Sequence, residues 1–84
     1  GLAVEWAGKG IRVNAIAPTF VRTNFGAARM QSNPELVAAI EADTPLGRFG
    51  EPWELAGGLL YLSSRASSMV TGVTLPIDGG WTAV

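Results

Sequence analysis

The stretch from Ile11 to Thr23, IRVNAIAPTFVRT, constrains the fold of this chain more than any other. Its first seven residues, Ile11 to Ala17, alternate with a period of two, and both sides of the alternation carry apolar atoms. This pattern predicts a β-strand in a sheet that is covered on both faces. Pro18 ends the strand because proline has no N–H to donate to a neighbour. Ligands of open parallel sheets bind beyond the C-terminal ends of the strands, so we expect functional residues between Pro18 and Thr23.

The composition narrows the classes of protein to which the chain can belong. It has 84 residues, 48% hydrophobic and 15% charged, with a formal net charge of −1. Such a chain makes one small domain at most, and it is too apolar for a disordered segment. The sequence has no stripe of basic residues of the kind that would predict nucleic-acid binding. Cysteine and histidine are absent, which excludes disulfides and removes the commonest metal ligands and general base. No apolar run approaches the roughly 20 residues that span a bilayer, and we expect a cytoplasmic protein.

Two helices are predicted downstream of the strand. Ser32 and Glu35 form an S-x-x-E capping box ahead of a short helix that ends near Ala42. Pro52 suits the first turn of a second helix, in which apolar residues recur at three- and four-residue spacing up to Ser63.

The second helix and the run after it define how the chain returns to the sheet. Glu51 and Glu54 place negative charge at the N-terminus of the helix, where the helix dipole favours it. Gly57 and Gly58 lie in the middle, where each costs about 1 kcal/mol relative to alanine, so we expect another backbone to approach closely there. The β-branched run Val73–Ile77 predicts a second strand, and a strand–helix–strand connection makes the two strands parallel.

Four stretches of the sequence resemble the short-chain dehydrogenase/reductase family. They are LAVEWAGKG (Leu2–Gly10), IRVNAIAPTFVRT (Ile11–Thr23), PLGRFGEPWELA (Pro45–Ala56) and ASSMVTGVTLPIDGGW (Ala66–Trp81). Their order and spacing are similar to those of the C-terminal third of a family member. The resemblance implies an α/β fold, in which residues 1–84 are the C-terminal part of one NAD(P)-binding, Rossmann-like domain. The chain would hold the last two strands of a doubly wound parallel sheet, with their helices.

The N-terminal residues agree with a fragment. Leu2 to Ala7 have helical spacing, but no cap residue precedes them. We interpret the chain as starting inside a helix, and the alternative is a processed or cloned N-terminus.

The resemblance also implies part of a site for NAD or NADP. Val21 would hold the nicotinamide carboxamide with its backbone N–H and C=O, and Pro18 would help to fix the path of the loop. Thr23 would give its hydroxyl to the carboxamide or the pyrophosphate, although an ordinary turn hydroxyl is the alternative. The family usually has glycine where this chain has Thr19, and this departure would narrow the pocket or alter the loop. These four residues are the candidate cofactor-binding residues.

The activity implied by the resemblance is hydride transfer between nicotinamide and a small alcohol or carbonyl substrate. The catalytic serine, the Tyr-x-x-x-Lys pair and the glycine-rich phosphate loop of the family are missing from this chain, so we expect no catalytic residues and no activity in residues 1–84 alone. Tyr61 and Arg65 have a similar spacing, but arginine does not substitute for lysine, and we expect Tyr61 to be a core or interface residue. No metal site is expected, because Glu35, Glu41 and Asp43 fit solvated helix ends.

Two further roles are expected for the rest of the chain. Residues 24–50 would form a lid over the substrate, as in the family, and the alternative is an irregular surface connection. The second helix and Val73–Ile77 would form a subunit contact in a homodimer or homotetramer, because the apolar residues around Leu60 wrap more than one helix face. The alternative function is a non-catalytic interaction or oligomerisation module with the same fold.

Overall fold

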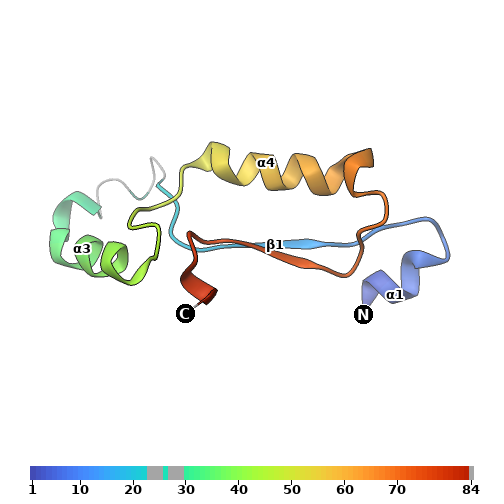
Figure 1. Ribbon diagram of the computed structural model, residues 1–84, viewed down its shortest axis with the longest axis horizontal. Helices are drawn as coiled ribbons and strands as arrows, with labels where there is room; N and C mark the ends of the chain where they lie inside the picture. Colours follow the sequence, from blue (N-terminus) through green and yellow to red (C-terminus); the bar gives the residue numbers. More distant parts are fainter. Residues whose placement is uncertain (23–25, 27–29, 84) are drawn as a thin grey trace.

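A computed structural model describes residues 1–22, 26 and 30–83 as a small parallel sheet with helices above it and at both of its ends (Figure 1). The elements, in chain order, are α1 (Leu2–Ala7), β1 (Ala15–Pro18), α3 (Pro34–Asp43), α4 (Pro52–Ser63), the 3-10 turn η1 (Arg65–Ser67), β2 (Thr74–Ile77) and the 3-10 turn η2 (Trp81–Ala83).

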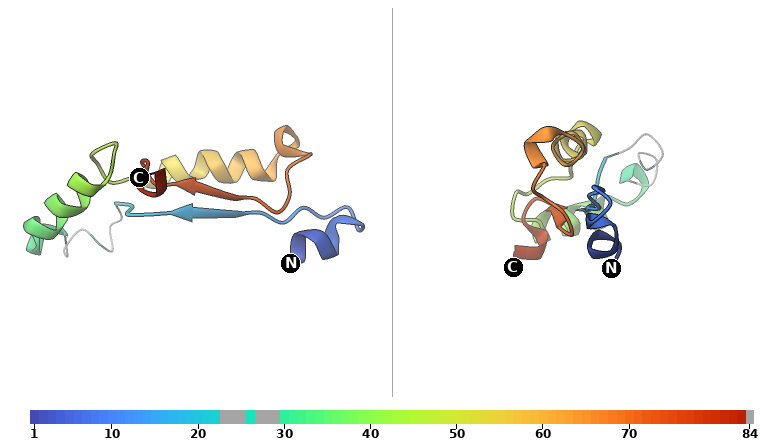
Figure 2. Two further views of the ribbon diagram at one scale, coloured as in Figure 1. Left: turned by 60° about the horizontal axis from the view of Figure 1, so that its bottom comes forward. Right: turned by 90° about the vertical axis from the view of Figure 1, so that its right-hand side faces the viewer.

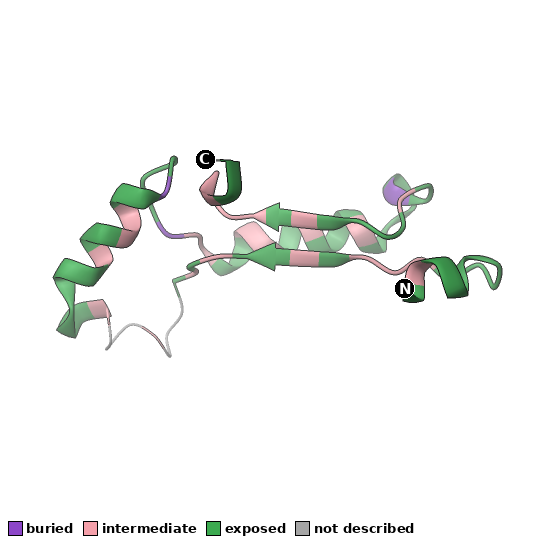
Figure 3. Cartoon of the chain, turned by 90° about the horizontal axis from the view of Figure 1, so that it is seen from below, coloured by how far each residue is buried: buried purple, intermediate pink, exposed green. Residues whose placement is uncertain are grey.

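The two strands run parallel and point toward α3, as Figure 2 shows, so the predicted strand–helix–strand unit is confirmed. Ile16 pairs with Leu75, and Ala15 pairs with Thr74. Paired residues share a face of the sheet, and Leu75 faces α4, because a Cβ on Gly58 would lie 3.5 Å from Leu75 Cδ2. Ile16 and Leu75 are half-buried, whereas Ala15 and Thr74 are exposed on the other face (Figure 3). Within the described residues, the expected cover on the second face is therefore missing.

β1 begins at Ala15 rather than at Ile11, because the side chain of Asn14 interrupts the backbone ladder, although the Gly72 N–H still donates to the Val13 carbonyl at 2.8 Å. Asn14 Oδ1 accepts a hydrogen bond from the Val73 N–H at 3.0 Å, and Asn14 Nδ2 donates to the Val70 carbonyl at 3.0 Å. The amide of one asparagine thus makes the contacts that backbone groups make further along the strands. For the same reason β2 begins one position after Val73.

The predicted capping box of the first helix is wrong. α3 begins at Pro34, and its N-cap is Asn33, whose Oδ1 accepts a hydrogen bond from the Leu36 N–H at 3.3 Å. Pro34 fills the first helical position, where no N–H is needed, so the cap falls on Asn33 instead of on Ser32.

α4 begins at Pro52 as predicted, but its two glycines have different surroundings. A Cβ on Gly58 would lie 2.6 Å from Ile77 Cδ1, whereas a Cβ on Gly57 would meet nothing within 4 Å. Within the described part of the chain, the close neighbour is therefore a side chain of β2, against only one of the two glycines, and the approach of another backbone stays a prediction for the contact between subunits. Neither α4 nor any other helix in the described part of the chain is long and apolar enough to cross a membrane.

The elements enclose very little interior. The accessible surface is 6173 Å², whereas a folded monomer of this mass exposes about 4800 Å². The radius of gyration is 15.9 Å, against about 12 Å for a compact domain of this length. Phe49 is the one buried apolar side chain among the described residues, while Trp53 and Leu60 on α4 are 72% and 70% exposed. Large apolar side chains of α4 therefore remain on the surface of this unit.

We predict that Asn14→Leu lowers the free energy of unfolding by about 1 to 2 kcal/mol, because the Val73 N–H loses its acceptor and the Val70 carbonyl loses one donor. Asn14→Asp keeps an acceptor for Val73 and should cost less. Urea unfolding of the protein measures both values. Equal stability of the leucine variant and the unsubstituted protein would contradict the role of Asn14 in joining the strands.

Candidate functional site

Three segments meet at the C-terminal ends of the two strands. They are residues 19–22 after β1, residues 44–51 between α3 and α4 (the connecting loop), and residues 78–80 after β2. The Leu46 N–H donates to the Gly79 carbonyl at 3.0 Å, and the Arg22 N–H donates to the Gly50 carbonyl at 2.7 Å. The connecting loop is therefore fastened to both strand ends, at the edge of the sheet where parallel sheets bind ligands.

The turn after β2 lies close against the connecting loop because Gly79 and Gly80 have no side chains. Gly79 and Gly80 have φ angles of 62° and 93°, which side chains disfavour. A Cβ on Gly79 would lie 2.8 Å from Thr44 Cγ2, and one on Gly80 would lie 3.0 Å from Pro45 Cβ. The backbone of the turn is thus packed directly against the start of the connecting loop.

Three aromatic rings lie against one another here: Phe20 and Phe49 come from the first two segments, and Trp81 directly follows the third. The Phe20 ring centroid lies 5.9 Å from that of Phe49 and 5.6 Å from that of Trp81. Such tilted and edge-on pairs are favourable arrangements of aromatic rings. Phe49 is 7% exposed, so the small interior of this chain lies at the strand ends rather than under α4.

The loop after β1 pairs with the connecting loop through a parallel bridge between Val21 and Gly50. The Gly50 N–H donates to the Phe20 carbonyl at 2.9 Å, and the Arg22 N–H donates to the Gly50 carbonyl. In extended backbone the polar groups of successive residues point to opposite sides, so the N–H and C=O of Val21 point away from Gly50. Neither group has a hydrogen-bond partner among the described residues. Within the described part of the chain, the bridge therefore presents one unpaired donor and one unpaired acceptor side by side.

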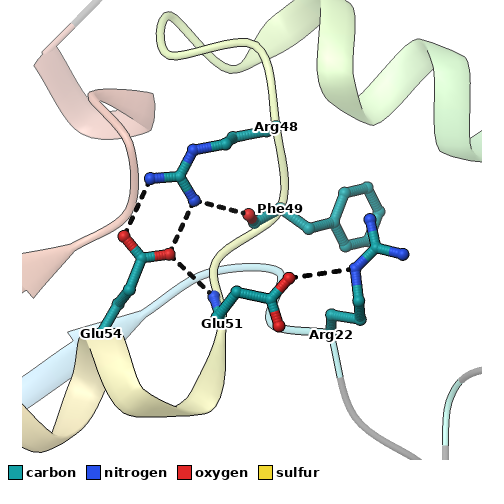
Figure 4. A network of polar contacts seen from close by, with 5 residues as sticks. All are labelled: Arg22, Arg48, Phe49, Glu51 and Glu54. Carbon is teal, nitrogen blue, oxygen red and sulfur yellow. Dashed lines mark hydrogen bonds and ion pairs between the residues drawn. The ribbon is translucent and has the colours of Figure 1, made fainter.

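A charged network stands beside this bridge (Figure 4). Arg48 donates two hydrogen bonds to Glu54, from Nη1 to Oε1 at 2.6 Å and from Nη2 to Oε2 at 2.8 Å. Arg48 Nη1 also donates to the Phe49 carbonyl at 3.1 Å, and the Glu51 N–H donates to Glu54 Oε1 at 3.0 Å. Arg22 Nε lies 3.3 Å from Glu51 Oε1. The hydrogen bonds from Arg48, followed by that from the Glu51 backbone, lower the pKa of Glu54 to about 2.

A cavity of about 300 Å³ lies among the three segments and is lined in part by Thr19 and Val21. Its charged wall residues already have partners, because Arg48 binds Glu54 and Asp78 accepts hydrogen bonds from its own turn. Among the described residues, the Val21 backbone thus offers polar groups without a partner, whereas the charged residues of the cavity wall are already paired.

The structure places the predicted site residues differently. Thr19 and Val21 lie together at the cavity, and Pro18 is the exposed last residue of β1, where it pairs with Ile77. Thr23 lies outside the described residues. No group of metal-binding side chains occurs in the described part of the chain.

Sequence reasoning missed Arg48 and Gly50. An arginine shortly before a glutamate in the first turn of a helix was an available signal for the pair of Arg48 and Glu54. The pairing of Gly50 with the loop after β1 is a backbone interaction, and no pattern of residue types predicts it.

A sequence profile of the family described as enoyl-(acyl carrier protein) reductase matches residues 1–82. The chain belongs to the short-chain dehydrogenase/reductase family.

Curated members of the family resemble the chain closely over its whole length. Galactitol 2-dehydrogenase (L-tagatose-forming) of Cereibacter sphaeroides is 51% identical over 96% of this chain and 32% of its own length. The 2-dehydro-3-deoxy-D-gluconate 5-dehydrogenase of Pseudoalteromonas atlantica is 45% identical over 95% of this chain and 31% of its own length. The chain spans about a third of the length of these relatives.

Solved structures of the family confirm the predicted fold class. A candidate 2-deoxy-D-gluconate 3-dehydrogenase from Agrobacterium tumefaciens with bound NADP is 44% identical, with a TM-score of 0.91 over 99% of this chain and 33% of its own. A 4-hydroxyisoleucine dehydrogenase mutant complexed with NADH and succinate is 34% identical, with a TM-score of 0.90 over 99% of this chain and 34% of its own. The two strands and their helices are thus part of a Rossmann-like doubly wound sheet.

We predict that the Glu54 carboxylate stays ionised in acid and that Arg48→Gln raises its pKa from about 2 toward the ordinary value of 4.5. Because the folded-state pKa is the lower one, the stabilisation by this pair is complete above the ordinary pKa and is lost as pH falls toward 2. NMR titration of the side-chain carboxyl carbon measures the midpoint. Arg65→Gln, at the far end of α4, is the control and should leave the midpoint unchanged. An unchanged midpoint in Arg48→Gln would show that the pair does not form in solution.

Proposed function

We propose that the chain is the C-terminal part of an NAD(P)-dependent dehydrogenase that transfers hydride between nicotinamide and an alcohol or carbonyl carbon. The family membership supports the reaction class, and the named relatives above are dehydrogenases. The structural observation that carries the proposal is the N–H and C=O of Val21, in the loop after β1, which have no partner among the residues that the structure describes.

The Val21 backbone fits the carboxamide of a nicotinamide ring. A carboxamide offers one carbonyl acceptor and one NH₂ donor, which complement a free N–H and a free C=O on the same residue. NAD or NADP supplies the hydride chemistry when bound, and this chain would bind and orient its ring. Pro18 would restrict the path of the loop, Thr23 would add a hydroxyl, and Thr19 would narrow the pocket where the family usually has glycine.

The substrate would lie beyond the C-terminal ends of the strands. α3 lies at this end of the molecule (Figure 2), so the proposal that residues 24–50 cover the substrate fits the position of the part that is described. The names of the curated relatives point to small polyhydroxy alcohols and their carbonyl counterparts as the substrate class.

The alternative is a non-catalytic interaction module with the same fold. The exposed apolar residues of α4 favour this alternative as much as they favour an oligomeric enzyme, so activity decides between them.

We predict that residues 1–84 alone do not turn over NAD(P)H, and that adding the N-terminal part, covalently or as a separate chain, restores turnover. Nicotinamide absorbance with a panel of polyols and ketoses follows the reaction. Turnover by residues 1–84 alone would contradict the proposal.

We predict that Thr23→Ala in the intact enzyme lowers turnover about fivefold, which corresponds to the loss of one hydrogen bond of about 1 kcal/mol. Thermal stability should change little, since the hydroxyl would bind the cofactor rather than the fold. Steady-state kinetics and thermal unfolding on the same samples separate the two effects. A lower melting temperature with full turnover per folded molecule would make Thr23 a structural residue.

We also propose that α4 and β2 form a two-fold contact between subunits, and we predict that Leu60→Lys dissociates it. Leu60 is 70% exposed on α4, and β2 has a free edge among the described residues, so both features are available to a second copy. Leu36→Lys is the matched control, because Leu36 is 54% exposed on α3, away from this surface. Light scattering at micromolar concentration measures the mass. A monomeric unsubstituted protein would rule the contact out.

A further inference from the structure

The orientation of Val21 depends on one peptide group of the connecting loop. The Gly50 N–H, which donates to the Phe20 carbonyl at 2.9 Å, belongs to the same planar peptide as the Phe49 carbonyl. Arg48 Nη1 donates to that carbonyl at 3.1 Å. The two ends of this peptide group are therefore both held, one by the guanidinium and one by the backbone just before Val21.

Glu54 anchors the arginine that holds this peptide. Its two carboxylate oxygens accept from both terminal nitrogens of Arg48, and its Oε1 also accepts from the Glu51 N–H. Because Glu54 lies in the first turn of α4, the chain of contacts runs from a rigid helix through a planar guanidinium to the peptide that pairs with Phe20. Hydrogen bonds in such a chain polarise and strengthen one another.

The ion pair of Arg22 with Glu51 is a second link between the same segments, but it is a weaker one. The two arginines are about equally exposed, at 55% and 52%, but Glu51 is 39% exposed against 22% for Glu54, and the pair of Arg22 and Glu51 is a single contact of 3.3 Å rather than a paired one. Exposed single ion pairs contribute little to stability. This pair serves as an internal comparison for the pair of Arg48 and Glu54.

We propose that Arg48 and Glu54 are positioning residues for the cofactor, and that they fix the direction of the Val21 N–H and C=O by holding the Phe49–Gly50 peptide. The inference rests on the proposed function of Val21 and adds two residues whose role is exerted through the Val21 backbone.

The test compares Glu54→Gln and Arg48→Lys in the intact protein. Glutamine keeps an oxygen acceptor for the Glu51 N–H but loses the charge, and lysine keeps the charge but cannot hold the carboxylate and the Phe49 carbonyl with one planar group. We expect faster amide hydrogen exchange at Gly50 and Arg22 without cofactor, and a dissociation constant for NADH or NADPH raised about fivefold, as for the loss of one hydrogen bond.

Two controls separate positioning from general destabilisation. Glu35→Gln removes an exposed glutamate from the first turn of α3, which also begins with proline, and should change neither readout. Glu51→Gln breaks the weaker ion pair and should raise the dissociation constant less than twofold. The melting temperature of each variant is measured on the same samples.

The possible results distinguish a failure of the positioning role from a failure of the proposed function. If the unsubstituted protein binds cofactor and Glu54→Gln binds it equally well, with unchanged exchange at Gly50 and Arg22, the positioning role is overturned while the proposed function stands. If the melting temperature falls and the folded fraction binds normally, the pair is structural and the inference is wrong. If the unsubstituted protein binds neither NADH nor NADPH, the proposed function fails and the positioning role falls with it.

Discussion

The pairing of Gly50 with Phe20 and Arg22 is the interaction on which the functional end of this chain depends. It joins the loop after β1 to the connecting loop and turns the polar groups of Val21 outward. The aromatic contacts of Phe20 with Phe49 and Trp81 and the glycine turn after β2 surround this pairing. The order of the strand ends thus comes from local contacts within the chain, even though little of the chain is buried.

The rest of the described chain leaves apolar surface exposed. α4 covers one face of the sheet (Figure 3), while Ala15 and Thr74 on the other face are exposed, as is Leu60 on α4. A doubly wound domain covers both faces of its sheet with helices, and relatives about three times as long have room to supply that cover. α4 and the uncovered face of the sheet thus leave apolar surface exposed, whereas the strand ends are held together by contacts within the chain.

The sequence predicted the features that depend on a single residue or on a regular repeat of apolar residues. Pro52 marked the start of α4, and the alternation around Ile16 indicated which side chains share a face. The predicted starts of elements were wrong where a side chain competes with the backbone for hydrogen bonds. β1 begins after Asn14, and the N-cap of α3 is Asn33 instead of Ser32. Within the site, the cofactor role of Val21 came from the family resemblance and remains a prediction. Its support by Gly50 could not be foreseen, because backbone pairing across 29 positions leaves no residue signature.

The exchange of the Val21 amide proton tests this account most directly. Hydrogen exchange of the intact protein is followed by NMR with and without saturating NADH or NADPH. If the nicotinamide carboxamide binds the Val21 backbone, the Val21 amide becomes protected at least about tenfold, while the Gly50 amide, already bonded to Phe20, changes little. Unchanged exchange at Val21 with cofactor bound would contradict the claim that this residue holds the nicotinamide.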